Sequence, residues 1–318
     1  MSSPAVPIGV HLSTFFRLWL RAADSLCLLF LAVLENVRGV RALLPVVVTV
    51  VLAGVGLFPA LLARAAGATC PGDMVRVRSF CIDRYEVSTV DKRSNAPLSP
   101  YYAPDARLVD AVHQQWLIEQ RTVGPDSARD FPLPELPTLQ KTRRDYVAQA
   151  VSSAGQIPQG YLSYPLAKLV CERAGKRLCS EEEWVTACKG ESGHKFPYGE
   201  HYEQGRCNVY RAIHPATALH GSASYGHRDP RLNLVSEASV GPLLRATGAT
   251  PTCASRWGSD RIYDMVGNLD EWVEDQVFVG GFYARATREG CESKVSSHAP
   301  AYYDYSTGTR CCRNVGEQ

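Results

Sequence analysis

The apolar positions of residues 166–190 repeat with helical spacing in two consecutive stretches. In the first stretch, one helical face is formed by residues at i, i+3, i+4 and i+8, namely Leu166, Leu169, Val170 and Ala174. Pro165 is tolerated in a first helical turn, and Gly175 suits the left-handed residue that ends many helices. This pattern predicts a short helix before residue 175.

The second stretch carries stronger signals for a helix. Ser180 followed by Glu183 is a capping box, and residues 181–183 place three glutamates at the positive end of the helix dipole. The apolar positions that follow are Trp184, Ala187 and Cys188. Gly190 ends the run. We therefore predict two short helices joined by a turn that contains Cys179, and we expect the rest of the chain to be organised around them.

Alternation of apolar and polar residues predicts short strands on either side of these helices. Residues 70–90 alternate with period two and indicate two strands with a turn near Arg78 and Ser79. Residues 277–281, with the sequence VFVGG, indicate a strand that ends in paired glycines. The predicted elements are all short.

Residues 91–160 form a long segment interrupted by prolines. Within it, residues 111–121 and 142–151 have compositions compatible with helices. Because no apolar pattern extends across the whole segment, we expect an ordered, loop-rich insertion and not a separate domain.

An uncharged apolar run at residues 42–63 is long enough to span a bilayer core. Arg38 and Arg41 precede it, which places the N-terminus in the cytoplasm and the rest of the chain outside. The run is either a transmembrane anchor or a cleaved signal peptide, with small residues near 63–68 offering cleavage sites. Residues 1–41 are then a cytoplasmic or a spurious extension. Both alternatives export the remainder, as a membrane-anchored, secreted or periplasmic domain.

Composition supports export and gives no reason to expect nucleic-acid binding. The net charge is +2 and the pI is about 8.0, which provides no strongly basic surface for nucleic acid. Ten of the 11 cysteines follow residue 69, an even number that suits a disulfide framework in an oxidising compartment. With 25 glycines and 20 prolines, a fold rich in loops is expected.

Six segments now stand out in a fixed order along the chain: AGKRLCSEEEW, FPYG, RCN, YDMVGNLDEWV, VFVGG and GTRCCR. This set resembles the formylglycine-generating enzyme family, also called the sulfatase-modifying factor family. The resemblance covers residues 70–313. It implies a single disulfide-rich α+β domain of the formylglycine-generating-enzyme fold, related to C-type lectins and poor in regular secondary structure, with residues 91–160 as an insertion.

The resemblance also implies a disulfide framework. By position, Cys171 pairs with Cys311 and Cys188 pairs with Cys291, as in the family's enzymes. The next choices for the remaining cysteines are Cys207 with Cys253, Cys179 with Cys312, and Cys70 with Cys81. The sequence by itself does not fix this connectivity.

The family's oxidation of a substrate cysteine requires two redox thiols that bind copper, just after the strand that ends in two glycines. In this chain no cysteine lies between Gly281 and Cys291, and the thiol positions fall near Arg285 and Gly290. Neither residue can replace a thiolate ligand. We therefore expect neither copper binding nor the family's oxidase activity.

A calcium site is better preserved. In the family, a loop of this form binds calcium through positions that correspond here to Asp264, Gly267, Leu269 and Glu271. Calcium prefers several oxygen ligands, and a turn with carboxylates and free carbonyls supplies them. The alternative is a turn in which Glu271 pairs with an arginine.

The family's substrate groove implies a binding surface built from Tyr283, Arg285, His298, Tyr302 and Tyr303. It would hold a peptide, a glycan or an envelope protein, although tyrosines in such a loop also serve packing. We thus predict an exported, non-catalytic binding domain. The alternative is a formylglycine-generating-type oxidoreductase that acts on a cysteine of a protein substrate.

Overall fold

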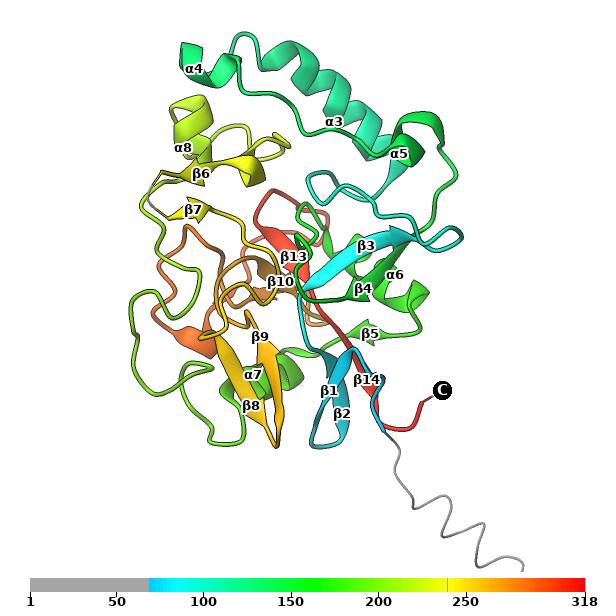
Figure 1. Cartoon of the computed structure of the whole chain (residues 1–318), viewed down its shortest axis with the longest axis vertical. Coiled ribbons are helices and arrows are strands. Elements are labelled where there is room, and N and C mark those ends of the chain that lie inside the picture. The colour runs from blue at the N-terminus through cyan, green and yellow to red at the C-terminus, as the bar shows by residue number, and fades with distance from the viewer. Residues whose placement is uncertain (1–68, 239, 318) are drawn as a thin grey trace, which may run out of the picture. The chain divides into compact units, whose positions relative to one another are not determined.

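The computed structural model of the protein describes residues 69–238 and 240–317 (Figure 1). The predicted N-terminal extension at 1–41 and the apolar run at 42–63 lie outside the described residues. Within the described part, no helix combines the length and the apolar character needed to cross a bilayer.

Two four-stranded sheets form the centre of the fold. The first has the order β1, β2, β14, β5, with the bounds Met74–Val77, Phe80–Asp83, Cys311–Asn314 and Arg177–Leu178. The second has the order β12, β11, β10, β13, with the bounds Lys294–Val295, Phe278–Val279, Asp270–Trp272 and Thr307–Thr309. Neighbouring strands are antiparallel except β10 and β13, which are parallel. Arg310 alone separates β13 from β14 and so joins the two sheets.

Three strand pairs complete the β-structure: β3 (Val87–Asp91) with β4 (Ala148–Ser152), β6 (Ser236–Glu237) with β7 (Gly241–Pro242), and β8 (Ala254–Trp257) with β9 (Asp260–Tyr263). All three pairs are antiparallel. Two 3-10 turns, Leu232–Leu234 and Gly290–Glu292, lie in the loops. The elements are short, as the sequence predicts, and the fold is a disulfide-rich α+β fold.

The two helices predicted at residues 166–190 are present. The first, α6 (Tyr164–Arg173), is capped by Ser163, whose hydroxyl accepts from the backbone of Leu166. The second, α7 (Glu181–Lys189), has the predicted capping box, with reciprocal hydrogen bonds between Ser180 and Glu183. The inward faces of both helices carry apolar residues and one cysteine each.

The segment at 91–160 contains three helices: α3 (Ala106–Glu119), α4 (Asp126–Arg129) and α5 (Thr138–Thr142). The strands β3 and β4 pair at the base of the segment, and α3, α4 and α5 lie together at one end of the view in Figure 1. The helix expected at 111–121 is confirmed as part of α3. The helix expected at 142–151 is wrong, because residues 143–147 are not helical and residues 148–151 pair with β3 as part of strand β4. A further short helix, α8 (Pro215–His220), follows later in the chain.

The reason for that correction is visible in the burial of β4. Ala148, Ala150 and Ser152 are buried, and the residues between them are half-buried, which is the period-two pattern of a strand. The carboxylate of Asp91 also accepts a hydrogen bond from the backbone of Val147, at 2.8 Å. Tertiary pairing with β3 therefore overrides the helix-compatible composition of this stretch.

Five disulfide bonds are formed: Cys70–Cys81, Cys171–Cys311, Cys179–Cys312, Cys188–Cys291 and Cys207–Cys253. These are the five pairs named from the sequence. Adjacent side chains on β14 point to opposite faces, so Cys311 reaches α6 while Cys312 reaches Cys179, which directly precedes the N-cap of α7. One strand thereby anchors both helices.

The disulfides with long loops should contribute most to stability. Replacing Cys171 and Cys311 by alanine opens a loop of 140 residues, whereas replacing Cys70 and Cys81 opens one of 11. In the chain-entropy model the first change should lower the free energy of unfolding by about 5 kcal/mol and the second by about 3 kcal/mol. Urea denaturation of both double variants measures this difference. Equal losses would contradict it.

Candidate functional site

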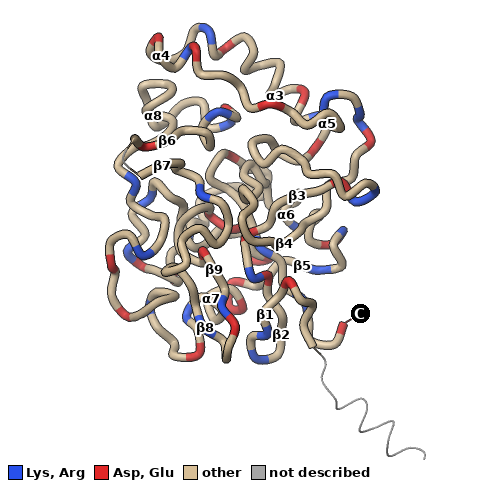
Figure 2. Tube along the Cα trace, viewed as in Figure 1, with Lys and Arg blue, Asp and Glu red and all other residues tan. Residues whose placement is uncertain are grey.

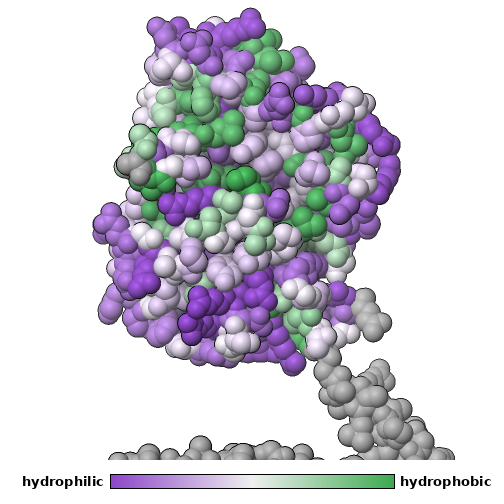
Figure 3. Space-filling view, viewed as in Figure 1, coloured by the Kyte–Doolittle hydropathy of each residue, from purple (hydrophilic) through white to green (hydrophobic). Residues whose placement is uncertain are grey.

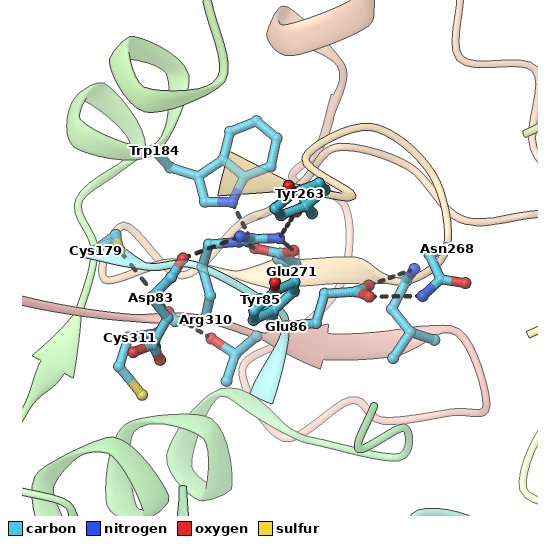
Figure 4. A network of polar contacts seen from close by, with 12 residues as sticks. Asp83, Tyr85, Glu86, Cys179, Trp184, Tyr263, Asn268, Glu271, Arg310 and Cys311 are labelled. Carbon is cyan, nitrogen blue, oxygen red and sulfur yellow. Dashed lines mark hydrogen bonds and ion pairs between the residues drawn. The ribbon is translucent and has the colours of Figure 1, made fainter. Parts of the chain in front are cut away.

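A buried ion pair between Glu271 and Arg310 lies where the two sheets join (Figure 4). Nε and Nη2 of Arg310 donate to the two carboxylate oxygens of Glu271 at 2.7 and 2.8 Å. The indole of Trp184, on α7, donates to the same carboxylate at 2.6 Å. Other guanidinium protons reach the carbonyl oxygens of Asp83 and Tyr263. A charge removed from water is stabilised here by a paired charge and by hydrogen bonds from several elements.

Glu271 is one of the four positions predicted for calcium, and the other three lie in the loop before β10. The carboxylate of Asp264 accepts a hydrogen bond from the backbone of Gly248 at 2.6 Å, and burial raises its pKa to about 6. Gly267 has a φ of +85°, and a Cβ there would lie 2.3 Å from the carbonyl oxygen of Asn208. Only glycine permits this close approach.

Leu269 is the last of the four positions predicted for calcium. Its backbone N–H, which is a donor and not an oxygen ligand, faces a carboxylate. That N–H donates to Glu86 at 3.1 Å, and Asn268 donates to the other Glu86 oxygen at 2.6 Å. Burial and the carboxylates of Asp264 and Glu271 raise the pKa of Glu86 well above its ordinary value. The region therefore holds three buried carboxyl groups, those of Glu86, Asp264 and Glu271, around one guanidinium. Figure 4 shows Glu86, Glu271 and Arg310.

These residues do not fit a calcium ion in this arrangement. Calcium takes six to eight oxygen ligands, yet both oxygens of Glu271 already accept hydrogen bonds from Arg310 or Trp184. Across residues 69–238 and 240–317, no group of three or more histidine, cysteine or acidic side chains is placed to hold a metal. The arrangement found is the alternative in which Glu271 pairs with an arginine.

Arg285 and Gly290, near which the resemblance places the family's redox thiols, are both constrained by their neighbours. Arg285 donates to Asp270 at 2.7 Å, and its guanidinium lies 5.0 Å from the ring centroid of Phe282. Burial raises the pKa of Asp270 to about 7, although Arg285 beside it favours the charged form. Gly290 has a φ of +57°, and a Cβ there would lie 2.3 Å from the carbonyl oxygen of Lys195. No side chain fits at residue 290 without movement of the backbone.

The five residues predicted to form a binding surface have different environments. Tyr283 is fully buried, and its hydroxyl donates to Asn233 at 2.9 Å, so it belongs to the core. His298 is exposed and stacks on Tyr302 with 3.9 Å between ring centroids. Tyr302 and Tyr303 line a pocket of about 320 Å³. Arg285, as described above, pairs with Asp270.

This aromatic pocket is completed by the insertion and by a loop after α8, through Trp116, Glu119, Tyr225 and Arg228. The guanidinium of Arg228 lies 4.3 Å from the ring centroid of Tyr303, and the hydroxyl of Tyr225 donates to Glu119 at 3.2 Å. We define the aromatic pocket by Tyr302, Tyr303 and these four residues. It offers flat apolar surfaces and one charge of each sign.

Sequence reasoning missed the contribution of the insertion to this pocket. Val109, Val112 and Trp116 are the buried residues of α3, at i, i+3 and i+7. That spacing marks one helical face. This spacing can be read from the sequence and indicates the helix. It does not indicate that Trp116 forms a wall of the pocket.

The fold defines a domain of the formylglycine-generating-enzyme type, and residues 282–290 contain no cysteine. The sequence profile of the family described as "Sulfatase-modifying factor enzyme 1-like domain" matches residues 47–315. The chain belongs to this family.

Particular relatives are distant. A "Formylglycine-generating enzyme" of Thermomonospora curvata is 24% identical over 217 residues, which cover 64% of this chain and 62% of the relative. An "Inactive C-alpha-formylglycine-generating enzyme 2" of Bos taurus is 27% identical over 122 residues, or 38% of this chain and 34% of the relative. The chain thus spans less than two-thirds of the length of either.

Two solved structures are also similar. PvdO from Pseudomonas aeruginosa has 17% identity and a TM-score of 0.33, covering 74% of this chain and 80% of that one. CarF has 12% identity and a TM-score of 0.36, covering 74% of this chain and 86% of that one.

Neutralising Glu271 should destabilise the protein severely. In the variant Glu271→Gln, Arg310 loses its paired charge in a buried site, and we expect the free energy of unfolding to fall by about 3–5 kcal/mol. The matched control Glu274→Gln breaks the exposed pair with Lys168 and should change stability little. Denaturant unfolding measures both variants.

The same measurement tests the calcium site. Millimolar calcium should raise the midpoint of thermal unfolding of the wild type no more than magnesium does, since a ligand stabilises only a fold that binds it. A calcium-specific rise that disappears in Glu271→Gln would show that Glu271 binds calcium after all.

Proposed function

We propose that this chain is an exported, non-catalytic member of its family that binds a peptide segment of another protein. The claim that the protein is non-catalytic rests on the two residues found near the expected redox thiol positions. Gly290 is packed against the carbonyl oxygen of Lys195, and Arg285 is paired with Asp270. Restoring a thiol pair would therefore require a change of backbone and not only of side chains.

The state of the cysteines supports the same proposal. In the described part of the chain all ten cysteines form disulfides, and those of Cys171, Cys179, Cys188, Cys291, Cys311 and Cys312 are fully buried. A copper-dependent oxidation requires exposed thiolates, because the thiolate is the metal ligand and nucleophile. Five disulfides are also typical of a protein that folds outside the cytoplasm.

The proposed binding of a peptide is supported by the aromatic pocket. The exposed ring of Tyr225 offers a flat surface on which a ligand side chain can pack, and Glu119 and Arg228 offer an acceptor and a donor beside it. A peptide presents apolar side chains and backbone donors and acceptors together. Glycan binding is the alternative that the second experiment below distinguishes.

Thiol titration of the full chain tests the non-catalytic proposal. In urea without reductant we expect no reactive thiol beyond that of Cys27, because the ten cysteines after residue 69 are oxidised. After reduction, ten further thiols should appear, which provides the control. A reactive pair in the native protein that binds copper(I) would favour the oxidoreductase instead.

Peptides selected from a display library against the full chain test the binding proposal. The variant Tyr225→Ala removes an exposed aromatic wall of the pocket and should weaken peptide binding about tenfold. Tyr202→Ala is a matched control, since Tyr202 is similarly exposed (39% against 48%) and lies outside the pocket. Equal weakening in both variants, or selective binding of glycans in place of peptides, would contradict the proposal.

A further inference from the structure

A second pocket, of about 540 Å³, lies beside the β8–β9 hairpin and the end of α7. Two disulfides fix its walls. Cys188, bonded to Cys291, directly precedes the lining residue Lys189. The bond between Cys207 and Cys253 holds together the lining segments at 206 and 251–254. The pocket is therefore part of the rigid frame and does not depend on mobile side chains for its shape.

The walls of this pocket are strongly basic. Five basic residues line it, namely Lys189, His194, Arg206, Arg256 and Arg261, against one acidic residue, Glu191. Three of the five have carboxylate partners, in the pairs Lys189–Glu292, His194–Glu200 and Arg206–Glu203. Figure 3 shows hydrophilic residues over the region of β8 and β9, and Figure 2 shows lysine and arginine positions there.

Arg256 and Arg261 are different from the other three. They are direct cross-strand partners on β8 and β9, so their side chains lie on one face of the hairpin. Within the described residues, neither guanidinium has a carboxylate partner or a hydrogen-bond acceptor. The carboxylate of Asp260, next to Arg261 in the sequence, is paired instead with Arg84 at 2.7 Å. Like charges directly opposite each other destabilise a strand pair. The fold thus retains an unfavourable contact at the wall of a pocket.

We propose that Arg256 and Arg261 form an oxyanion site, which binds a phosphate or sulfate group carried by a ligand. Two guanidinium groups side by side present donors that match the oxygens of such a group, and a bound dianion removes their mutual repulsion. Lys189 and Arg206 line the same pocket, but their charges are offset by Glu292 and Glu203, so Arg256 and Arg261 supply the positive charge that has no carboxylate partner within the described residues. The volume accommodates more than a single ion. This site is separate from the aromatic pocket and does not depend on the proposed function.

Calorimetry of the full chain with inorganic pyrophosphate and with sulfate, at low ionic strength, tests the site. We expect saturable binding that each of Arg256→Gln and Arg261→Gln weakens about tenfold or more, because each removes charge-assisted hydrogen bonds. Arg107→Gln is the matched control, since Arg107 is exposed and lies outside the pocket. Neither pocket variant should lower the midpoint of thermal unfolding, because each removes a repulsive contact.

A vesicle assay identifies the source of the anionic group. Phosphatidylcholine vesicles with and without phosphatidylglycerol are compared, and only the difference in binding between the two is used, so that any contribution of apolar residues outside the pocket is subtracted. Stronger binding to the anionic vesicles that is lost in Arg256→Gln/Arg261→Gln assigns the site to lipid phosphate. If pyrophosphate or sulfate binds but the anionic vesicles bind no more strongly than the neutral ones, the site is assigned to a soluble ligand. Binding to neither probe, or equal weakening by Arg107→Gln, overturns the proposal.

Discussion

The contact between Glu271 and Arg310 is the constraint on which the arrangement of the sheets depends. Arg310 is the only residue between β13 and β14, so its side chain sits at the passage from one sheet to the other. Glu271 comes from β10 and Trp184 comes from α7, and both reach the same point. A buried arginine is tolerated only where its charge and its donors are satisfied. The strands and α7 must therefore meet in this one register.

The disulfides act on the same region from outside. Cys311 and Cys312 follow Arg310 directly and bond to opposite sides of the sheet. The carboxylate of Asp83, on the neighbouring strand, accepts from the backbone of Cys311 at 2.9 Å and pairs with Lys176 at 2.5 Å. The interior of this protein is thus held by covalent bonds and ion pairs close to one strand, which suits a fold with few long elements. The sequences of the surrounding loops can therefore vary without loss of these bonds.

Local signals in the sequence predicted the local structures well. The capping box at Ser180 and the first helix depend only on neighbouring residues, and both are confirmed. The predicted face of that helix is only partly correct, because its buried residues are Ala167, Val170 and Cys171. Contacts between distant residues were harder to predict. Residues 148–152 form a strand because β3 lies beside them, and Glu271 is engaged by an arginine 39 residues away. Tyr283 reads as part of an aromatic surface in the sequence, but the fold directs its hydroxyl to Asn233 in the core.

The frame of this fold does not depend on the segment that follows the paired glycines. Neither Arg285 nor Gly290 takes part in the Glu271–Arg310 contact or in the five disulfides. Both pockets are likewise lined mainly by loops and element ends, where residues can change without disturbing the frame. Since the frame supplies stability, the side chains at these edges can be selected for the ligand alone. Within residues 69–238 and 240–317, Arg256 and Arg261 of the β8–β9 hairpin have no carboxylate partner, so the frame does not depend on their charges.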